Sequence, residues 1–128
     1  QTCALPISDV LIDLQRNHPP AVAWFTTAEI PLYVSGIAMM EVFTGCRNRN
    51  EWLKAEAFFA PFECLWLSEQ GFGVALRAIL PLRLANGIGM TDALIASTAL
   101  DHNLPLATFN TKHFSHVAGL QTVQPYLR

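Results

Sequence analysis

Apolar residues at helical spacing alternate along this chain with short apolar runs of the kind that form strands. The helical pattern predicts helices over residues 9–15, 21–28, 38–46, 51–59, 69–80 and 91–101. Short β-rich runs predict strands over residues 31–35, 63–67, 104–108 and 120–123. Because strands separated by helices tend to pair in parallel, the pattern favours an α/β fold with three layers and a mainly parallel central sheet.

Polar residues, proline and asparagine mark the ends of several predicted elements. The run NHPP at residues 17–20 interrupts the first helix, since paired prolines cannot continue one. Ser68 is a candidate N-cap, and Pro81 should kink or end the helix that follows it. Asn103 suits a left-handed C-terminal cap. Three aromatic residues are expected in the core or in an interface, rather than as base-stacking platforms: Trp24, Trp52 and Trp66.

The composition fits one domain over residues 1–128 with a sizeable core. With 52% hydrophobic and 14% charged residues, the chain has little charged surface, which indicates an interface with a partner or a second copy. The net charge of −2 gives no global attraction for nucleic acid, so local groups or a bound metal would have to supply it.

The sequence gives no sign of a membrane span or of export. No apolar run reaches the roughly 18–20 residues that a span requires, and no signal peptide is evident. Cys3, Cys46 and Cys64 lie far apart without a C-x-x-C pair, which is typical of reduced, mostly buried thiols. The cytoplasm is therefore the expected location.

Three carboxylates stand at strand ends and helix starts, where a parallel sheet opens its binding crevice. Asp92 follows the candidate N-cap Thr91, so it lies in a first helical turn, where the helix dipole favours an anion. Glu41 interrupts an apolar run, where an unpaired carboxylate is costly to bury. Asp9 follows another apolar run. Together they indicate a site for a hard cation such as magnesium.

Four segments of the chain form a recognisable pattern: DVLID (9–13), MMEVFTG (39–45), TDALIASTAL (91–100) and LPLATFNTKHF (104–114). This pattern resembles the PIN-domain ribonucleases, and most closely the VapC-type toxins of bacterial toxin–antitoxin pairs. The resemblance implies a three-layer α/β/α domain in which acidic residues bind Mg²⁺ or Mn²⁺ and RNA phosphodiester bonds are hydrolysed. A cation suits that reaction because it neutralises the phosphate and lowers the pKa of the attacking water. The resemblance also implies a homodimer and a cognate antitoxin that covers the site.

The resemblance assigns roles to individual positions. Glu41 matches the family's glutamate and Asp92 its third acidic position, so both are expected to bind the metal. Asp9, the third candidate ligand, matches a polar position that more often lies beside the metal ligands. Asn110 stands at the fourth acidic position and Thr108 at a threonine of the same pocket, and both are expected to orient water or substrate.

The chain departs from the family pattern at position 7, where Ile7 replaces the first aspartate. Residues 4–7 (ALPI) back-translate to the end of a common sequencing adapter, so we interpret residues 1–8 as a non-native scar that replaces the natural start. In the family the first strand lies in the middle of the sheet, where Pro6 cannot donate to the ladder. We therefore expect a distorted first strand and weakened metal binding.

Several other polar residues could have either a structural role or a role in the site. Asp13 is expected to be a solvated helix residue. His113 and His116 have the spacing of a ligand pair, although two histidines in a turn are more often surface residues. Three cationic residues follow the acidic segments and could meet RNA phosphates or simply be solvated: Arg47, Arg49 and Lys112.

The sequence thus predicts a metal-dependent endoribonuclease, the toxin of a type II toxin–antitoxin pair. Two alternatives stay open. If Ile7 is genuine, the absent carboxylate favours a catalytically inactive PIN-like binding module. A magnesium-dependent small-molecule phosphatase would need a nucleophilic aspartate after the first strand and a lysine near a later strand, for which Lys112 is the only candidate.

Overall fold

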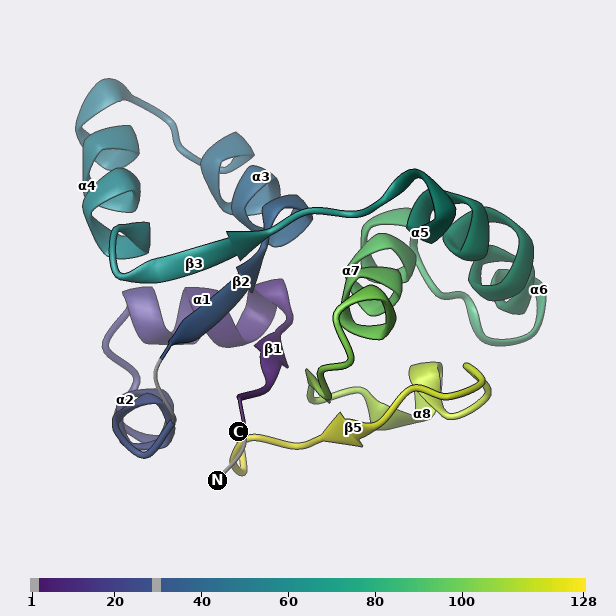
Figure 1. The fold of residues 1–128 in the computed structure, drawn as a ribbon. Coiled ribbons are helices and arrows are strands. Elements are labelled where there is room, and N and C mark those ends of the chain that lie inside the picture. The colour runs from purple at the N-terminus through teal and green to yellow at the C-terminus, as the bar shows by residue number, and fades with distance from the viewer. Residues whose placement is uncertain (1–2, 29–30) are drawn as a thin grey trace.

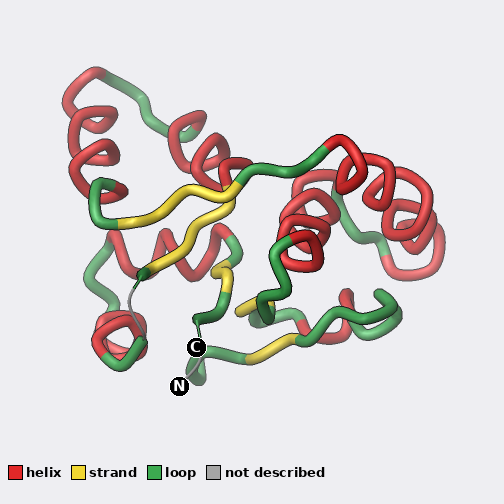
Figure 2. The backbone as a smooth tube through the Cα atoms, in the orientation of Figure 1, coloured by secondary structure: helices red, strands yellow, loops and turns green. Residues whose placement is uncertain are grey.

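Parallel strands run through the middle of the molecule in two ladders (Figures 1 and 2). The computed structural model describes residues 3–28 and 31–128. One ladder has the order β1 (Leu5–Pro6), β4 (Leu106–Ala107) and β5 (Thr122–Val123), and the other pairs β2 (Leu32–Ser35) with β3 (Phe62–Leu65). All three pairings are parallel. This arrangement confirms the predicted α/β fold.

Strand β1 is short because of Pro6. The backbone N–H groups of Leu5 and Ile7 donate to Pro105 and Ala107 beside β4, at 2.8 and 3.0 Å. Successive residues of a strand direct their N–H groups to opposite sides, so position 6 faces β2, where proline has no donor. Within the described residues β1 therefore has no ladder with β2. The expected distortion of the first strand is present.

The helices form two groups on either side of β1 (Figure 1). The N-terminal group, around β2 and β3, consists of α1 (Ser8–Gln15), α2 (Pro19–Thr26), α3 (Gly36–Thr44) and α4 (Arg49–Phe59). The second group consists of α5 (Glu69–Val74), η1 (Ala75–Ile79), η2 (Leu80–Leu82), α6 (Arg83–Asn86) and α7 (Met90–Asp101). Helix α8 (Thr111–Phe114) lies near β5. Among the described residues, no helix is long and apolar enough to cross a membrane.

Local sequence explains most helix boundaries, and it also shows where two predictions are wrong. Ser68 caps α5 by accepting from the Gly71 N–H at 2.9 Å, and Asn103 has a positive φ of 55°, both as predicted. The paired prolines at 19–20 begin α2 instead of preceding it. Proline is tolerated there because the backbone N–H groups of a first helical turn have no partner within the helix, so the N–H that proline lacks is not missed. Thr91 is not an N-cap, since α7 already begins at Met90 after Gly89.

The core includes residues that we interpreted as a scar. Leu5 is fully buried, Ile7 is 6% exposed, and both pack in the central cluster with Leu11, Leu106 and Phe114. Residues 1 and 2 lie outside the described part of the chain, and the interpretation as a scar stays a prediction. Two of the tryptophans expected in the core or in an interface lie outside the core, on α4 and after β3: Trp52 (46% exposed) and Trp66 (60% exposed). For these two, the interface stays a prediction.

Candidate functional site

Glu41 is positioned by α3, which begins directly where β2 ends. The Ser35 hydroxyl oxygen accepts from the Ile37 N–H at 3.1 Å and so caps the helix. The half-buried Glu41 carboxylate accepts a hydrogen bond from the hydroxyl of Ser8, the first residue of α1. No role was predicted for Ser8, because residues 1–8 were interpreted as a non-native scar.

Asp92 lies half-buried in the first turn of α7, as predicted. Burial raises the pKa of Asp92 above its ordinary value, and the negative charges of Glu41 and Asp9 raise this pKa further, while His113 lowers it. Carboxylates from α1 and α3 therefore lie close enough to Asp92 on α7 to disfavour its charge. A cation beside these carboxylates would relieve their repulsion.

Ile7 occupies the backbone position that links β1, β4 and α1. It is the N-cap of α1 with φ −74° and ψ 164°, and its side chain supplies no capping hydrogen bond. An aspartate with this backbone geometry is among the preferred N-cap residues. The backbone conformation at position 7 thus suits an aspartate, but the residue there is the apolar Ile7.

Thr108 and Asn110 form the turn after β4. Thr108 is 2% exposed, and its hydroxyl oxygen accepts from the backbone N–H of Asn110 at 3.1 Å. The Asn110 side chain is exposed. In the part of the chain that the structure describes, no hydrogen bond joins either side chain to Glu41 or Asp92. Their predicted role in orienting water or substrate stays a prediction.

The prediction that Asp13 is solvated is wrong. Asp13 is 8% exposed, and the Tyr126 hydroxyl donates to its Oδ2 at 2.8 Å, while Arg128 Nη2 lies 3.2 Å from Oδ1. Burial and the bond to Asp13 raise the pKa of Tyr126 above its ordinary range. Arg128 Nη1 also lies 3.7 Å from Asp9 Oδ2. The sequence signal was the i, i+4 spacing of Asp9 and Asp13, which places both on one face of α1.

The carboxylates present fit a magnesium-type ion held by two protein side chains. Mg²⁺ in proteins is commonly bound through one or two carboxylates, with water and substrate phosphate in its other positions. Glu41 and Asp92 are of this kind, whereas Asp9 is exposed and paired with Arg128. Among the described residues no three His, Cys, Asp or Glu side chains lie close enough to enclose an ion. Within residues 3–28 and 31–128, His113 and His116 belong to no group of three such side chains.

Comparison with known proteins shows the class of this chain. The PIN domain family model matches residues 8–120, so the chain belongs to the PIN-domain family. The curated protein Ribonuclease VapC1 of Rickettsia felis is 28% identical over 126 residues, which cover 91% of each chain.

Two solved structures are similar over nearly their whole length. A toxin–antitoxin complex from Klebsiella pneumoniae has a chain with a TM-score of 0.78 and 27% identity, covering 98% of this chain and 99% of that one. A chain of DNA-bound VapBC from Salmonella typhimurium has a TM-score of 0.81 at 19% identity, covering 98% and 100%. The second likeness concerns the fold alone.

Proposed function

We propose that this PIN-domain protein is a metal-dependent endoribonuclease and the toxin of a type II toxin–antitoxin pair. The observation that carries the proposal is the convergence of Glu41 and Asp92, whose repulsion contributes to the raised pKa of Asp92. The similarity to proteins named Ribonuclease VapC supports an RNA substrate. The toxin–antitoxin complex from Klebsiella pneumoniae, which has the same fold, supports an antitoxin partner.

In this proposal Glu41 and Asp92 bind Mg²⁺ or Mn²⁺. The bound cation supplies charge neutralisation at the phosphate and a lower pKa for the attacking water. The Ser8 hydroxyl orients the Glu41 carboxylate by donating to Oε1. Thr108 and Asn110, at the end of β4, orient water or substrate, and Asp9 contributes negative charge at the edge of the site.

The remaining parts of the proposal concern assembly and location. We propose a homodimer, in which a second copy covers exposed apolar side chains, and an antitoxin that covers the acidic site. A cytoplasmic location fits the free thiols of Cys46 and Cys64, although both are only half-buried, contrary to the expectation of mostly buried thiols.

Ile7 favours a second candidate function, a catalytically inactive PIN-like binding module. Its apolar side chain stands where the resemblance implies a carboxylate, and fewer carboxylates hold a cation less tightly. A small-molecule phosphatase gains no such support, because the Lys112 side chain is exposed on α8.

An RNA cleavage assay with Mn²⁺ separates these functions. We expect Ile7→Asp to cleave a mixed RNA pool at least about tenfold faster than the chain as given, since a further carboxylate ligand stabilises the transition state by about 1.4 kcal/mol or more. Ile7→Asn is the matched control, because asparagine also caps a helix but brings no negative charge. Adding Asp92→Asn to Ile7→Asp should abolish cleavage. If no folded variant cleaves RNA, the nuclease function is excluded and the inactive binding module remains as the candidate function.

A further inference from the structure

A groove leads away from Glu41 across the N-terminal group of helices. It has a volume of about 640 Å³ and is bordered by α1, α3 and α4. Glu41 lies in its wall, and Ile12, Val42 and Phe58 supply apolar surface. Because Glu41 belongs to the acidic site, whatever occupies this groove lies directly beside that site.

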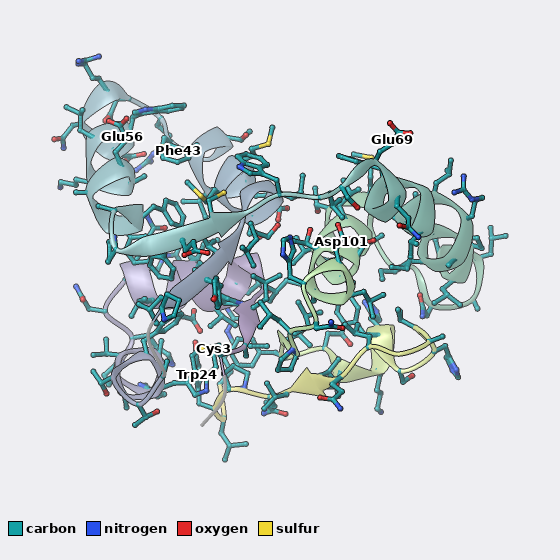
Figure 3. All side chains as sticks on the ribbon, in the orientation of Figure 1. Cys3, Trp24, Phe43, Glu56, Glu69 and Asp101 are labelled. Carbon is teal, nitrogen blue, oxygen red and sulfur yellow. The ribbon has the colours of Figure 1, made fainter. Side chains whose placement is uncertain are left out.

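A shallower basin of about 380 Å³ continues the groove around the start of α4. Groove and basin share Cys46 and Arg47 and therefore adjoin, and we refer to the two together as the depression. Trp52 borders the basin with 46% of its surface exposed. The Trp52 ring packs on Phe43, with centroids 4.5 Å apart, and Phe43 lies between α3 and α4 (Figure 3). The exposed Trp52 ring thus packs against a second aromatic ring.

Half of the chain's cationic side chains border the depression. They are four of the eight lysines and arginines: Arg16, Arg47, Arg49 and Lys54. Arg47 forms an ion pair with Glu51 at 2.9 Å. Within residues 3–28 and 31–128, the other three have no ion-pair partner. In a protein of net charge −2, this concentration produces a local positive surface beside an acidic site.

We propose that the depression binds single-stranded RNA and leads it to Glu41 and Asp92. Arg16, Arg49 and Lys54 contact successive phosphates, and a base stacks on Trp52. Unpaired cations along a groove, with an aromatic ring at one end, are the combination that binds single-stranded nucleic acid. The proposal rests on the proposed nuclease function and adds the path of the substrate. An acidic peptide is the competing occupant, but it does not explain an exposed tryptophan at the outer end.

The test is fluorescence anisotropy with a labelled single-stranded RNA 12-mer, in a chelator so that no cleavage occurs. Arg16→Ala and Lys54→Ala should each weaken binding about three- to tenfold and reduce the slope of log affinity against log salt by about 0.7. Trp52→Ala should weaken binding at least about fivefold without changing that slope, because stacking involves no counterion release. Arg77→Ala is the matched control, since Arg77 is also exposed but lies on η1, away from the depression, and should bind normally.

The outcomes separate this inference from the nuclease function. If Arg16→Ala and Lys54→Ala bind RNA like Arg77→Ala while Ile7→Asp cleaves it, the path is refuted and the nuclease stands. If binding weakens as expected but no variant cleaves, the path stands and the nuclease fails. Displacement of the RNA by an equal concentration of a poly-glutamate 12-mer would overturn the assignment to RNA in favour of an acidic peptide.

Discussion

At the scale of single residues, Asp92 is a carboxylate whose charged form the fold disfavours. It is half-buried, and both Glu41 and Asp9 oppose its ionisation. Without a bound cation, the folded protein is less stable with an ionised Asp92 than it would be with a neutral side chain at this position. Residues that lower stability in this way are typical of functional sites. The function proposed for Asp92 therefore has a consequence for stability that can be measured without any substrate.

We predict that Asp92→Asn raises the melting temperature by a few degrees at pH 7 in a chelator. Because the folded-state pKa of Asp92 is raised, the original chain loses stability as the pH rises from about 3.8, the usual aspartate value, through the folded-state pKa. The difference between the two proteins should vanish below pH 3.8. Added Mn²⁺ should stabilise only the original chain. A less stable Asp92→Asn protein at pH 7 would contradict this account.

The buried Asp13 gives a second prediction at this scale. Tyr126→Phe removes the hydroxyl that donates to Asp13 Oδ2, and should lower the free energy of unfolding by about 1.5–3 kcal/mol, the range for hydrogen bonds to charged groups. Urea denaturation measures this loss. Tyr33→Phe is the control, since the described residues give the Tyr33 hydroxyl no hydrogen bond, and it should change stability by less than about 0.5 kcal/mol. Equal effects of the two changes would show that the bond is not stabilising.

Single residues also show how far a sequence can predict a site. Glu41 and Asp92, whose role as metal ligands stays a prediction, could be singled out because each has a local signal. Glu41 is a charge in an apolar run, and Asp92 is a carboxylate in a first helical turn, where the helix dipole favours an anion. The role of Asp13 could not be predicted, because its partners lie 113 and 115 residues away in the chain. The i, i+4 spacing of Asp9 and Asp13 shows that the two residues share a face of α1, but it does not show which distant residues pack on that face.

At the scale of elements, Pro6 determines how the sheet is divided. The strands that the sequence predicted are all present, although β4 and β5 have only two residues each. The long helix expected over residues 69–80 is divided into α5, a π-helical turn and a 3₁₀ turn, because Pro81 cannot donate to a regular helix. The end of the regular helix before Pro81 was predictable from the missing donor, whereas the division of the sheet required knowing the neighbours of β1.

We predict that Pro6→Val joins the two ladders. Valine supplies an N–H group that faces β2 and has a high β propensity, so the free energy of unfolding should rise by about 1 kcal/mol. Hydrogen exchange measured by NMR gives the direct readout, because the new amide at position 6 should be protected. An amide that exchanges at the rate of an unfolded peptide would show that β2 offers it no acceptor.

At the scale of the whole molecule, exposed apolar residues concentrate in one part of the chain. Five large apolar side chains between residues 66 and 90 are half or more exposed: Trp66, Phe72, Leu76, Leu84 and Met90. A monomer rarely exposes so much apolar surface without a partner. The low charge content indicated such an interface, but only the structure shows which segment exposes it.

We predict that the protein is a dimer through this segment. Leu84→Asp places a charge on a side chain that is 95% exposed, and should shift the protein toward a monomer in analytical ultracentrifugation. Leu127→Asp is the matched control, because Leu127 is 87% exposed but lies outside the segment. A monomeric original chain, or an equal effect of both variants, would exclude this interface.

The most direct test of the central claim is the binding of Mn²⁺ measured by electron paramagnetic resonance, which requires no RNA. If Glu41 and Asp92 together hold the cation, Glu41→Gln and Asp92→Asn should each weaken Mn²⁺ binding about tenfold or more. Glu56→Gln on the exposed face of α4 should bind like the original chain (Figure 3). Equal Mn²⁺ affinity in all four proteins would contradict the account, because the cation would then bind elsewhere.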